Sequence, residues 1–343
     1  MMIFFVLILF MTLPSLVCAM NGFMNRSALS MFSDDVKDRV GNMEEMYMVD
    51  ATVRSNFTES RPLWSSPFIF FHQRKAGGSS IRDTLKRAAD TNQYDPFVPC
   101  YGYSCDIYQL PTHKPYGLYA GHFPWGSQYV FDRLGGTHNR DKFSCLTNFR
   151  EPVSRLISCV EFRFPAHVKK YGCMSNLPKD RLIEILSTKT DEYGNSCLSE
   201  PFRIMSGFAD EDVLNGLGIE VNAKNMSDNF SSPGTHYEIY PKFTDVEALV
   251  LKLTLNNVAK CGVVILEEPR KETNLLLSRR FPDLYSAGAF RPVYLNKEHA
   301  FEKCPALKPE QIEILEKFGA FERLLYDIVV KQQRNMVARL LEI

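Results

Sequence analysis

The chain has 343 residues, in which 40 Lys and Arg side chains balance 40 Asp and Glu side chains. This length is enough to bury the core of one large domain with appendages. Because the formal net charge is zero, no overall attraction to nucleic acid or to a membrane surface is expected. Any preference for an acidic substrate has to come from a local basic patch.

The N-terminal segment, residues 1–19, is apolar over most of its length. The apolar run is short for a membrane span, which needs roughly 20 residues, and no Lys or Arg precedes it. Val17-Cys-Ala19 offers small residues at the positions that a signal peptidase reads. We interpret the segment as a cleaved signal peptide or an uncleaved signal-anchor, which would be the only part of the chain to contact a membrane. Four Asn-x-Ser/Thr sequons agree with a secretory route and begin at Asn25, Asn56, Asn225 and Asn229.

Eight of the nine cysteines follow Cys18. An even number in an oxidising lumen suggests disulfides, although the spacing leaves the connectivity open. The local pairs that we expect first are Cys100 with Cys105 and Cys173 with Cys197. Cys145 and Cys261 lie within apolar runs, so the alternative for these two is that they are buried free thiols. No CxxC spacing typical of a zinc site is present, and the sequence gives no reason to expect a metal.

Residues 20–65 carry many Met, Asp, Glu, Asn and Ser residues and little apolar periodicity, and are interpreted as a stem that is partly helical over 34–48. From Pro67 onward strand and helix patterns alternate. This alternation predicts one α/β domain over residues 66–343, with a central, mainly parallel sheet flanked by helices. The expected strands are 68–72, 116–120, 143–149 and 262–266.

Helix patterns separate these strands. Residues 80–89 place Ile81, Leu85 and Ala88–Ala89 on one face. Thr244-Asp-Val-Glu247 has the pattern of a capping box before a helix over 246–258. Further helices are expected from about residue 271, from Pro309 and over 321–341. The region 161–240 is rich in Gly, Ser, Asn and Pro with weak periodicity, so it is expected to form loops over the substrate side.

The most informative stretch of the chain runs from Phe68 to Arg82. An apolar strand there meets a Gly77-Gly78 turn, which Lys75 precedes and the hydroxyls of Ser79 and Ser80 follow, before a helix begins. The first backbone N–H groups of a helix lack partners and can hold a phosphate. A Walker A loop has its lysine after the glycines and a Ser/Thr directly after that lysine, so the ATPase signature does not fit.

A second motif, Phe149-Arg-Glu-Pro-Val-Ser-Arg-Leu-Ile-Ser158, lies at the end of the expected strand 143–149. Pro152 suits the first turn of a helix. Ser158 then falls about two turns into that helix, on the same side as Arg150. Arginine offers a planar fork for phosphate oxygens, and Ser158 adds a hydroxyl donor. Arg155 is expected to pair with Glu151 or to support the loop.

Together, in this order and spacing, the two motifs resemble the nucleotide signatures of Golgi-type carbohydrate sulfotransferases, and most closely those of the heparan and chondroitin sulfate O-sulfotransferases. That family usually reads Pro-Lys-Thr-Gly-Gly-Thr-Ser at the first site and Arg-(Asp/Glu)-Pro-(hydrophobic)-Ser-Arg at the second. Here Arg74 stands in place of the proline, and Ala76 and Ser79 stand in place of threonines. Alanine lacks the hydroxyl, so any contact by that side chain is lost.

The resemblance implies a P-loop-type three-layer fold and a reaction in the Golgi lumen, in which a sulfuryl group moves from 3′-phosphoadenosine 5′-phosphosulfate to a hydroxyl, expected to be that of a glycan. An uncleaved signal-anchor is the usual arrangement in this family. The residues expected to hold the 5′-phosphate are Lys75, Ala76, Gly77, Gly78, Ser79 and Ser80, and Lys75 would also neutralise charge on the leaving oxygen. Arg150 and Ser158 would bind the 3′-phosphate.

The expected base is His122, which follows the strand 116–120 in a Gly-His pair that relatives of this class also carry. A neutral histidine there could take the proton of the acceptor hydroxyl. The alternative is a carboxylate, with Glu161 nearest to the second motif. Arg163, Lys169 and Lys170 alternate with the aromatic residues Phe162, Phe164 and Tyr171. That composition suits an acidic sugar chain but is also typical of a solvated loop edge.

Two other functions compete with this reading. A P-loop kinase acting on a small molecule would have the same type of fold. It needs a Ser/Thr that binds magnesium directly after a loop lysine, and this loop lacks that order. A non-catalytic glycan-binding protein could retain the fold, but such a protein would be expected to lack Lys75 or His122. Both residues are present in this chain.

Overall fold

The computed structural model describes residues 67–91, 93–99, 116–127, 143–188, 197–206, 245–266, 270–281 and 304–341, together with Asn42 and Glu44. The expected signal segment, the four sequons, Thr244 of the capping box and the pair Cys100–Cys105 lie outside these residues. Of the expected stem only Asn42 and Glu44 are described. Both are helical, and Glu44 pairs with Lys331 near the C-terminus.

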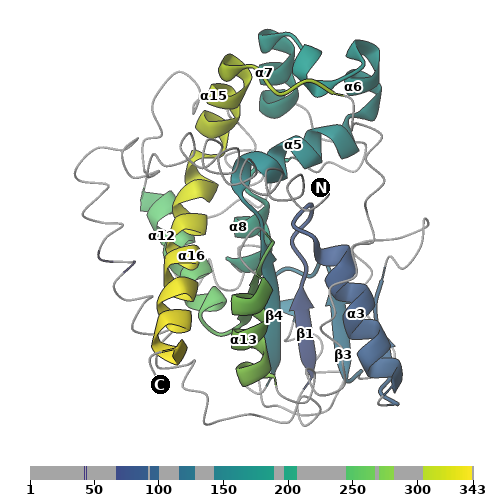
Figure 1. The fold of residues 1–343 in the computed structure, drawn as a ribbon, viewed down its shortest axis with the longest axis vertical. Helices are drawn as coiled ribbons and strands as arrows, with labels where there is room; N and C mark the ends of the chain where they lie inside the picture. The colour runs from purple at the N-terminus through teal and green to yellow at the C-terminus, as the bar shows by residue number, and fades with distance from the viewer. Residues whose placement is uncertain are drawn as a thin grey trace, which may run out of the picture.

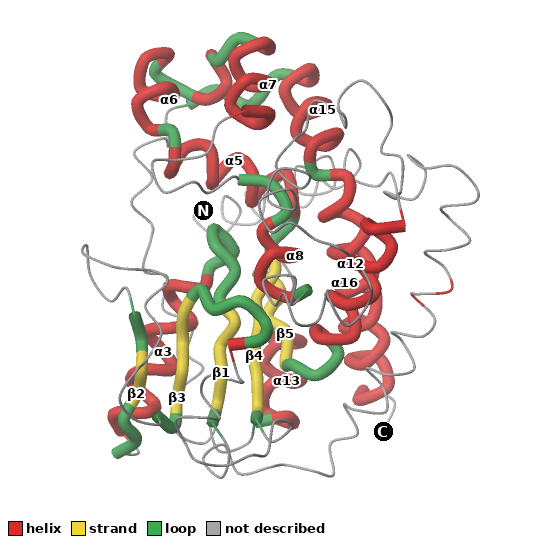
Figure 2. The backbone as a smooth tube through the Cα atoms, turned by 180° about the vertical axis from the view of Figure 1, so that it is seen from behind, coloured by secondary structure: helices red, strands yellow, loops and turns green. Residues whose placement is uncertain are grey.

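The centre of the fold is a five-stranded sheet in which every pair of neighbours is parallel, in the order β2-β3-β1-β4-β5 (Figure 2). The strands are β1 (Phe68–Phe71), β2 (Pro96–Phe97), β3 (Leu118–Gly121), β4 (Ser144–Phe149) and β5 (Gly262–Ile265). Four of them confirm the expected strands to within two residues at each end. The sequence missed β2, because two residues are too few to show a periodic pattern. The α/β class and the parallel sheet are thus confirmed.

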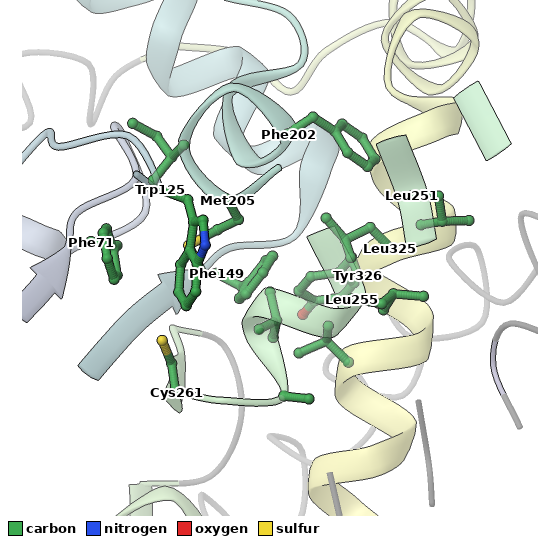
Figure 3. Close-up of a cluster of buried hydrophobic side chains, with 14 of the residues drawn as sticks. Phe71, Trp125, Phe149, Phe202, Met205, Leu251, Leu255, Cys261, Leu325 and Tyr326 are labelled. Atoms are coloured by element: carbon green, nitrogen blue, oxygen red, sulfur yellow. The ribbon is translucent and has the colours of Figure 1, made fainter. Parts of the chain in front are cut away.

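Helices cover both faces of the sheet (Figure 1). On one face, Phe68 and Phe70 of β1 pack with α3 (Gly78–Thr91) and α13 (Arg270–Arg280). On the other, Ile69 and Phe71 belong to a larger cluster with α8 (Glu200–Met205), α12 (Asp245–Val258) and α16 (Ala320–Leu341), part of which Figure 3 shows. Alternate residues of β1 therefore enter two separate cores, which is why its run is apolar without alternation.

A group of four helices lies beyond the carboxyl ends of the strands and packs around a third apolar cluster (Figure 1). We call it the helical cap. It consists of α5 (Pro152–Arg163), α6 (Pro165–Tyr171), α7 (Lys179–Thr188) and α15 (Pro309–Phe318). The expectation of loops over 161–240 was therefore wrong for its described part, which holds α6, a 3₁₀ turn (Met174–Asn176), α7 and α8. These helices are too short to show a clear periodic pattern in the sequence. They are stabilised by tertiary packing more than by their local sequence.

Three disulfides join distant parts of the chain: Cys145–Cys261, Cys159–Cys197 and Cys173–Cys304. The expected pair Cys173–Cys197 was wrong, since each of these cysteines has a different partner. The free-thiol alternative for Cys145 and Cys261 was also wrong. Leu146 pairs with Gly262 between β4 and β5, so this register brings the two preceding cysteines together despite their separation of 116 residues.

Three disulfides indicate an oxidising compartment, either secretory or extracellular. Among the residues described, no helix is both long and apolar enough to cross a bilayer.

Candidate functional site

The two sequence motifs meet at one edge of the sheet. In the register, Phe71 lies opposite both Gly121 of β3 and Thr147 of β4, so the segments that follow these three strands leave the sheet side by side. From β1 the chain proceeds to β2 and β3 on one side, whereas β4 and β5 lie on the other. Ligands of open α/β sheets bind at such a change of direction, outside the carboxyl ends of the strands. Here that position lies between β1 and β4.

Buried polar side chains of β4 hold the loop after β1 in place. Asn148 accepts a hydrogen bond from the Gln73 backbone N–H at 2.9 Å and donates to the carbonyls of Gln73 at 3.2 Å and Ala76 at 2.7 Å. Thr147 donates to the Phe71 carbonyl at 3.1 Å and accepts from the Gln73 amide at the same distance. Sequence reasoning missed Thr147 and Asn148, although two polar residues inside an apolar strand were a usable signal.

The backbone of this loop curls sharply. Lys75 and Gly77 both have positive φ, 60° and 76°. A side chain at Gly78 would overlap the imidazole of His72, so only glycine fits there. The helix α3 starts at Gly78, so its first turn lies at the end of this loop, where the sequence predicts that Gly77 to Ser80 hold a phosphate. Ala76 is 1% exposed, so only its backbone could serve a ligand.

Lys75 lies under the helical cap, beside α5. Its ammonium nitrogen is 4.0 Å from the centroid of the Phe162 ring. Burial, with the charges of Arg150 and Arg163, lowers the pKa of Lys75 to about 8, and the charge of Glu161 opposes this. The Arg150 guanidinium donates to the Lys75 carbonyl at 3.2 Å, so the fold brings these two predicted site residues together. Ser158 lies partly exposed on α5, one turn before Phe162.

His122 lies at the carboxyl edge, as expected. Its Nδ1 is 2.8 Å from the carbonyl oxygen of His72. A carbonyl only accepts, so Nδ1 carries the proton and Nε2 keeps its lone pair in the neutral ring. Burial, helped by the charge of Arg74, lowers the pKa of His122 to about 4, against the opposing charge of Glu200. The ring is therefore neutral near pH 7 and stays able to accept a proton.

The His122 ring stacks on that of His72, with centroids 4.1 Å apart. His72 is buried, and its Nδ1 has no hydrogen-bond partner among the described residues. Burial first, then the neighbouring cations, hold the pKa of His72 well below its ordinary value. Within the described part of the chain no direct contact joins His122 to Lys75. The alternative base, Glu161, is the carboxylate whose charge acts on Lys75.

Sequence reasoning missed Glu200, which joins the loop after β1 to α8. Its carboxylate accepts the Arg74 backbone N–H at 3.2 Å and the Arg74 guanidinium at 3.4 Å. Arg203 adds a bond at 2.6 Å. Burial would raise the pKa of Glu200, but Arg74, Arg203 and His122 outweigh it and hold that pKa well below its usual range. The preceding residue, Ser199, has a positive φ of 57°.

Arg155 of the second motif is structural. It is 1% exposed and binds Glu322 of α16 through two bonds of 2.8 and 2.6 Å, while also donating to the Cys197 carbonyl at 2.6 Å. Of the two alternatives expected for Arg155, the pair with Glu151 was wrong, since its carboxylate partner is Glu322. Glu151 instead caps α5 by accepting the N–H groups of Val153 and Ser154, and pairs with Arg323. Arg155 thereby supports the segment that carries Glu200.

Basic and aromatic side chains gather at the junction of α5 and α6, as the sequence indicates. Phe162 is 68% exposed, Arg163 is partly exposed, and Lys169 and Lys170 are exposed. The Lys170 ammonium lies 5.7 Å from the centroid of the Tyr171 ring. Phe164, by contrast, is buried in the cluster of the helical cap, so it cannot contact a ligand there.

Within the described ranges, no three His, Cys, Asp or Glu side chains are grouped as a metal ion would require. Comparison with known proteins adds no identification, since no family model and no curated protein matches the chain.

Proposed function

We propose that the chain is a sulfotransferase of the P-loop type, which transfers a sulfuryl group from 3′-phosphoadenosine 5′-phosphosulfate to a glycan hydroxyl in the Golgi lumen. The observation that carries the proposal is the meeting of the two motifs between β1 and β4. There the start of α3, Lys75 and Arg150 come together at the edge where ligands of such sheets bind.

The residues present fit a donor with two phosphates. The start of α3, with the hydroxyls of Ser79 and Ser80, suits the 5′-phosphate, because a helix N-terminus attracts anions. Arg150 and Ser158 suit the 3′-phosphate. Lys75 is still mostly protonated at neutral pH with its pKa of about 8, so it can stabilise charge on the bridging oxygen.

The reaction needs one proton acceptor. As the bond from sulfur to the bridging oxygen breaks, the acceptor oxygen bonds to sulfur and its proton must leave. His122 supplies a neutral Nε2, fixed by the bond from Nδ1 to the His72 carbonyl. Glu161 supplies a carboxylate on the Lys75 side of the site. We favour His122, because its tautomer and its neutral state are both set by the surrounding structure.

The kinase alternative is weaker on structural grounds. The residue after Lys75 is a buried alanine, which offers no hydroxyl to a magnesium ion. A non-catalytic glycan-binding protein would not need the loop geometry around Lys75 or the fixed tautomer of His122.

Calorimetric titration with adenosine 3′,5′-bisphosphate, adenosine 5′-monophosphate and ATP tests the donor. The bisphosphate should bind best, and Arg150→Ala or Ser158→Ala should weaken it by about tenfold or more while hardly changing the monophosphate. Equal losses for both ligands would instead mean that the start of α5 had been damaged. Preferential binding of ATP would support the kinase, and sulfate transfer from radiolabelled donor to a panel of glycans would exclude the binding protein.

A further inference from the structure

Phe162 occupies an unusual position for an aromatic ring. It is the only aromatic side chain among the exposed large hydrophobic residues of the described chain, and it stands on the last turn of α5 with 68% of its surface exposed. One face of the ring carries the ammonium of Lys75 at 4.0 Å. A ring that only filled space in the helical cap would be buried, as Phe164 is two residues later.

The cation on this ring is the one that the donor would use. Lys75 lies among like charges, since Arg150 and Arg163 both act to lower its pKa. A cation–π contact at a partly exposed site is worth only about two- to fivefold in an equilibrium constant. A charge-assisted bond to a phosphate oxygen is stronger, and it relieves the repulsion between these cations. An anionic donor should therefore draw Lys75 away from the ring.

We propose that Phe162 positions the acceptor: Lys75 rests on its ring until the donor binds, and the ring face that Lys75 then leaves stacks against the pyranose ring of the acceptor sugar. The inference rests on the proposed function. It makes binding ordered, with the donor first, because the stacking face is covered while the donor is absent. Arg163 follows Phe162 directly, so a second cation stands beside the stacking ring.

The adenine of the donor is the other flat group that could use this ring. In the donor, the sulfuryl group and the base lie at opposite ends of the nucleotide. Phe162 contacts Lys75, which the proposed function assigns to the bridging oxygen at the sulfuryl end. The sugar that receives the sulfuryl group has to approach that end, so the geometry favours the acceptor over the base.

Phe162→Leu tests the proposal, because leucine keeps an apolar side chain but removes the aromatic face. We expect this variant to bind adenosine 3′,5′-bisphosphate about two- to fivefold more tightly, since Lys75 no longer has a ring to leave. Its KM for desulfated heparan or chondroitin chains should rise by about two- to tenfold with a smaller change in kcat, and Phe162→Trp should restore the KM. Ile312→Ala removes an exposed apolar group from α15 and should change neither value.

Binding of the acceptor chains by the wild type, measured with and without the bisphosphate, tests the order. The bisphosphate should strengthen acceptor binding in the wild type and have less effect in Phe162→Leu. Unchanged bisphosphate affinity and acceptor KM in Phe162→Leu would overturn the proposal. So would weaker bisphosphate binding that Phe162→Trp restores, since the ring would then stack on adenine. Failure of the wild type to bind the bisphosphate would overturn the proposed function itself, which keeps the two failures distinguishable.

Discussion

At the scale of single residues, the site holds two groups whose pKa values lie well below their ordinary values. Lys75 keeps its charge although burial and Arg150 lower its pKa to about 8, and its backbone is left-handed. His122 stays neutral with a pKa of about 4. Such shifts and strained backbone positions concentrate at functional sites, because the surrounding fold has to impose them. Here Asn148 and Thr147 hold the backbone of the loop after β1, while burial and the neighbouring cations produce the two pKa shifts.

Replacing Lys75 with methionine should separate function from stability. The unfolded chain binds the lysine proton more tightly than the folded chain, so the charge costs the fold on the order of 1–3 kcal/mol near neutral pH. We expect Lys75→Met to reduce turnover by about a hundredfold or more without lowering the thermal midpoint. Calorimetry and a transfer assay with radiolabelled donor measure the two effects. Retained turnover with lost donor binding would reduce Lys75 to a phosphate anchor.

The titration of His122 gives a prediction with a definite sign. Its pKa is about 4 in the fold and about 6.5 when unfolded, so between these values the unfolded chain binds more protons. The contribution of His122 to stability is therefore complete above about pH 6.5 and falls as the pH drops towards 4. Proton NMR should show this imidazole titrating near 4, with kcat/KM level from neutral pH to about 5 and falling below.

His122→Ala should abolish turnover while leaving bisphosphate binding intact. Glu161→Gln tests the alternative base in the same turnover and binding assays. If Glu161→Gln abolishes turnover and His122→Ala does not, Glu161 is the base. An acid limb of kcat/KM alone does not separate them, because a carboxylate titrates in the same range.

At the scale of elements, α8 connects the candidate site to the core. The Cys159–Cys197 disulfide and the bond from Arg155 to the Cys197 carbonyl fix the chain just before this helix. Glu200, its first residue, then holds Arg74. Removing the charge of Glu200 takes the buried carboxylate away from the partly buried Arg74 and Arg203, which is more costly than losing a surface pair.

Glu200→Gln keeps the shape of the side chain and removes its charge. We expect a loss of about 1–3 kcal/mol in unfolding free energy and weaker bisphosphate binding. The His122 pKa should fall further, because Glu200 is the carboxylate that raises it. Glu313→Gln removes an exposed carboxylate that pairs with Lys317 at 2.8 Å, and should leave the unfolding free energy almost unchanged. An unmoved His122 titration in Glu200→Gln would contradict the electrostatic link.

At the scale of the whole molecule, the sequence predicts what lies along continuous patterns. The apolar runs of β1, β3, β4 and β5 and the amphipathic α3 and α16 could be located because each carries its own signal. The helices α6 and α8 could not, since each is too short to form alone and depends on contacts with distant parts of the chain. The role of Glu200 could not be predicted either, because it depends on contacts between distant parts of the chain. The contact of Phe162 with Lys75 was missed because it forms only when α5 lies over the loop after β1.

Two of the disulfides among the described residues should differ in what they support: one should matter more for stability, and the other more for ligand binding. Cys173–Cys304 joins the segments next to α6 and α15 and closes a loop of chain with a sequence separation of 131 residues, whereas Cys159–Cys197 joins α5 to the segment before α8 with a separation of 38. A disulfide that closes a longer loop restricts the unfolded chain more, so removing Cys173–Cys304 should destabilise the fold by about 1 kcal/mol more than removing Cys159–Cys197. Only the shorter one fixes the segment that leads to Glu200. Cys173→Ala with Cys304→Ala should therefore lose more unfolding free energy yet keep bisphosphate affinity, whereas Cys159→Ala with Cys197→Ala should lose affinity by about tenfold. Chemical denaturation and calorimetry of the two double variants measure both quantities, and equal affinities would show that α8 holds its place without the disulfide.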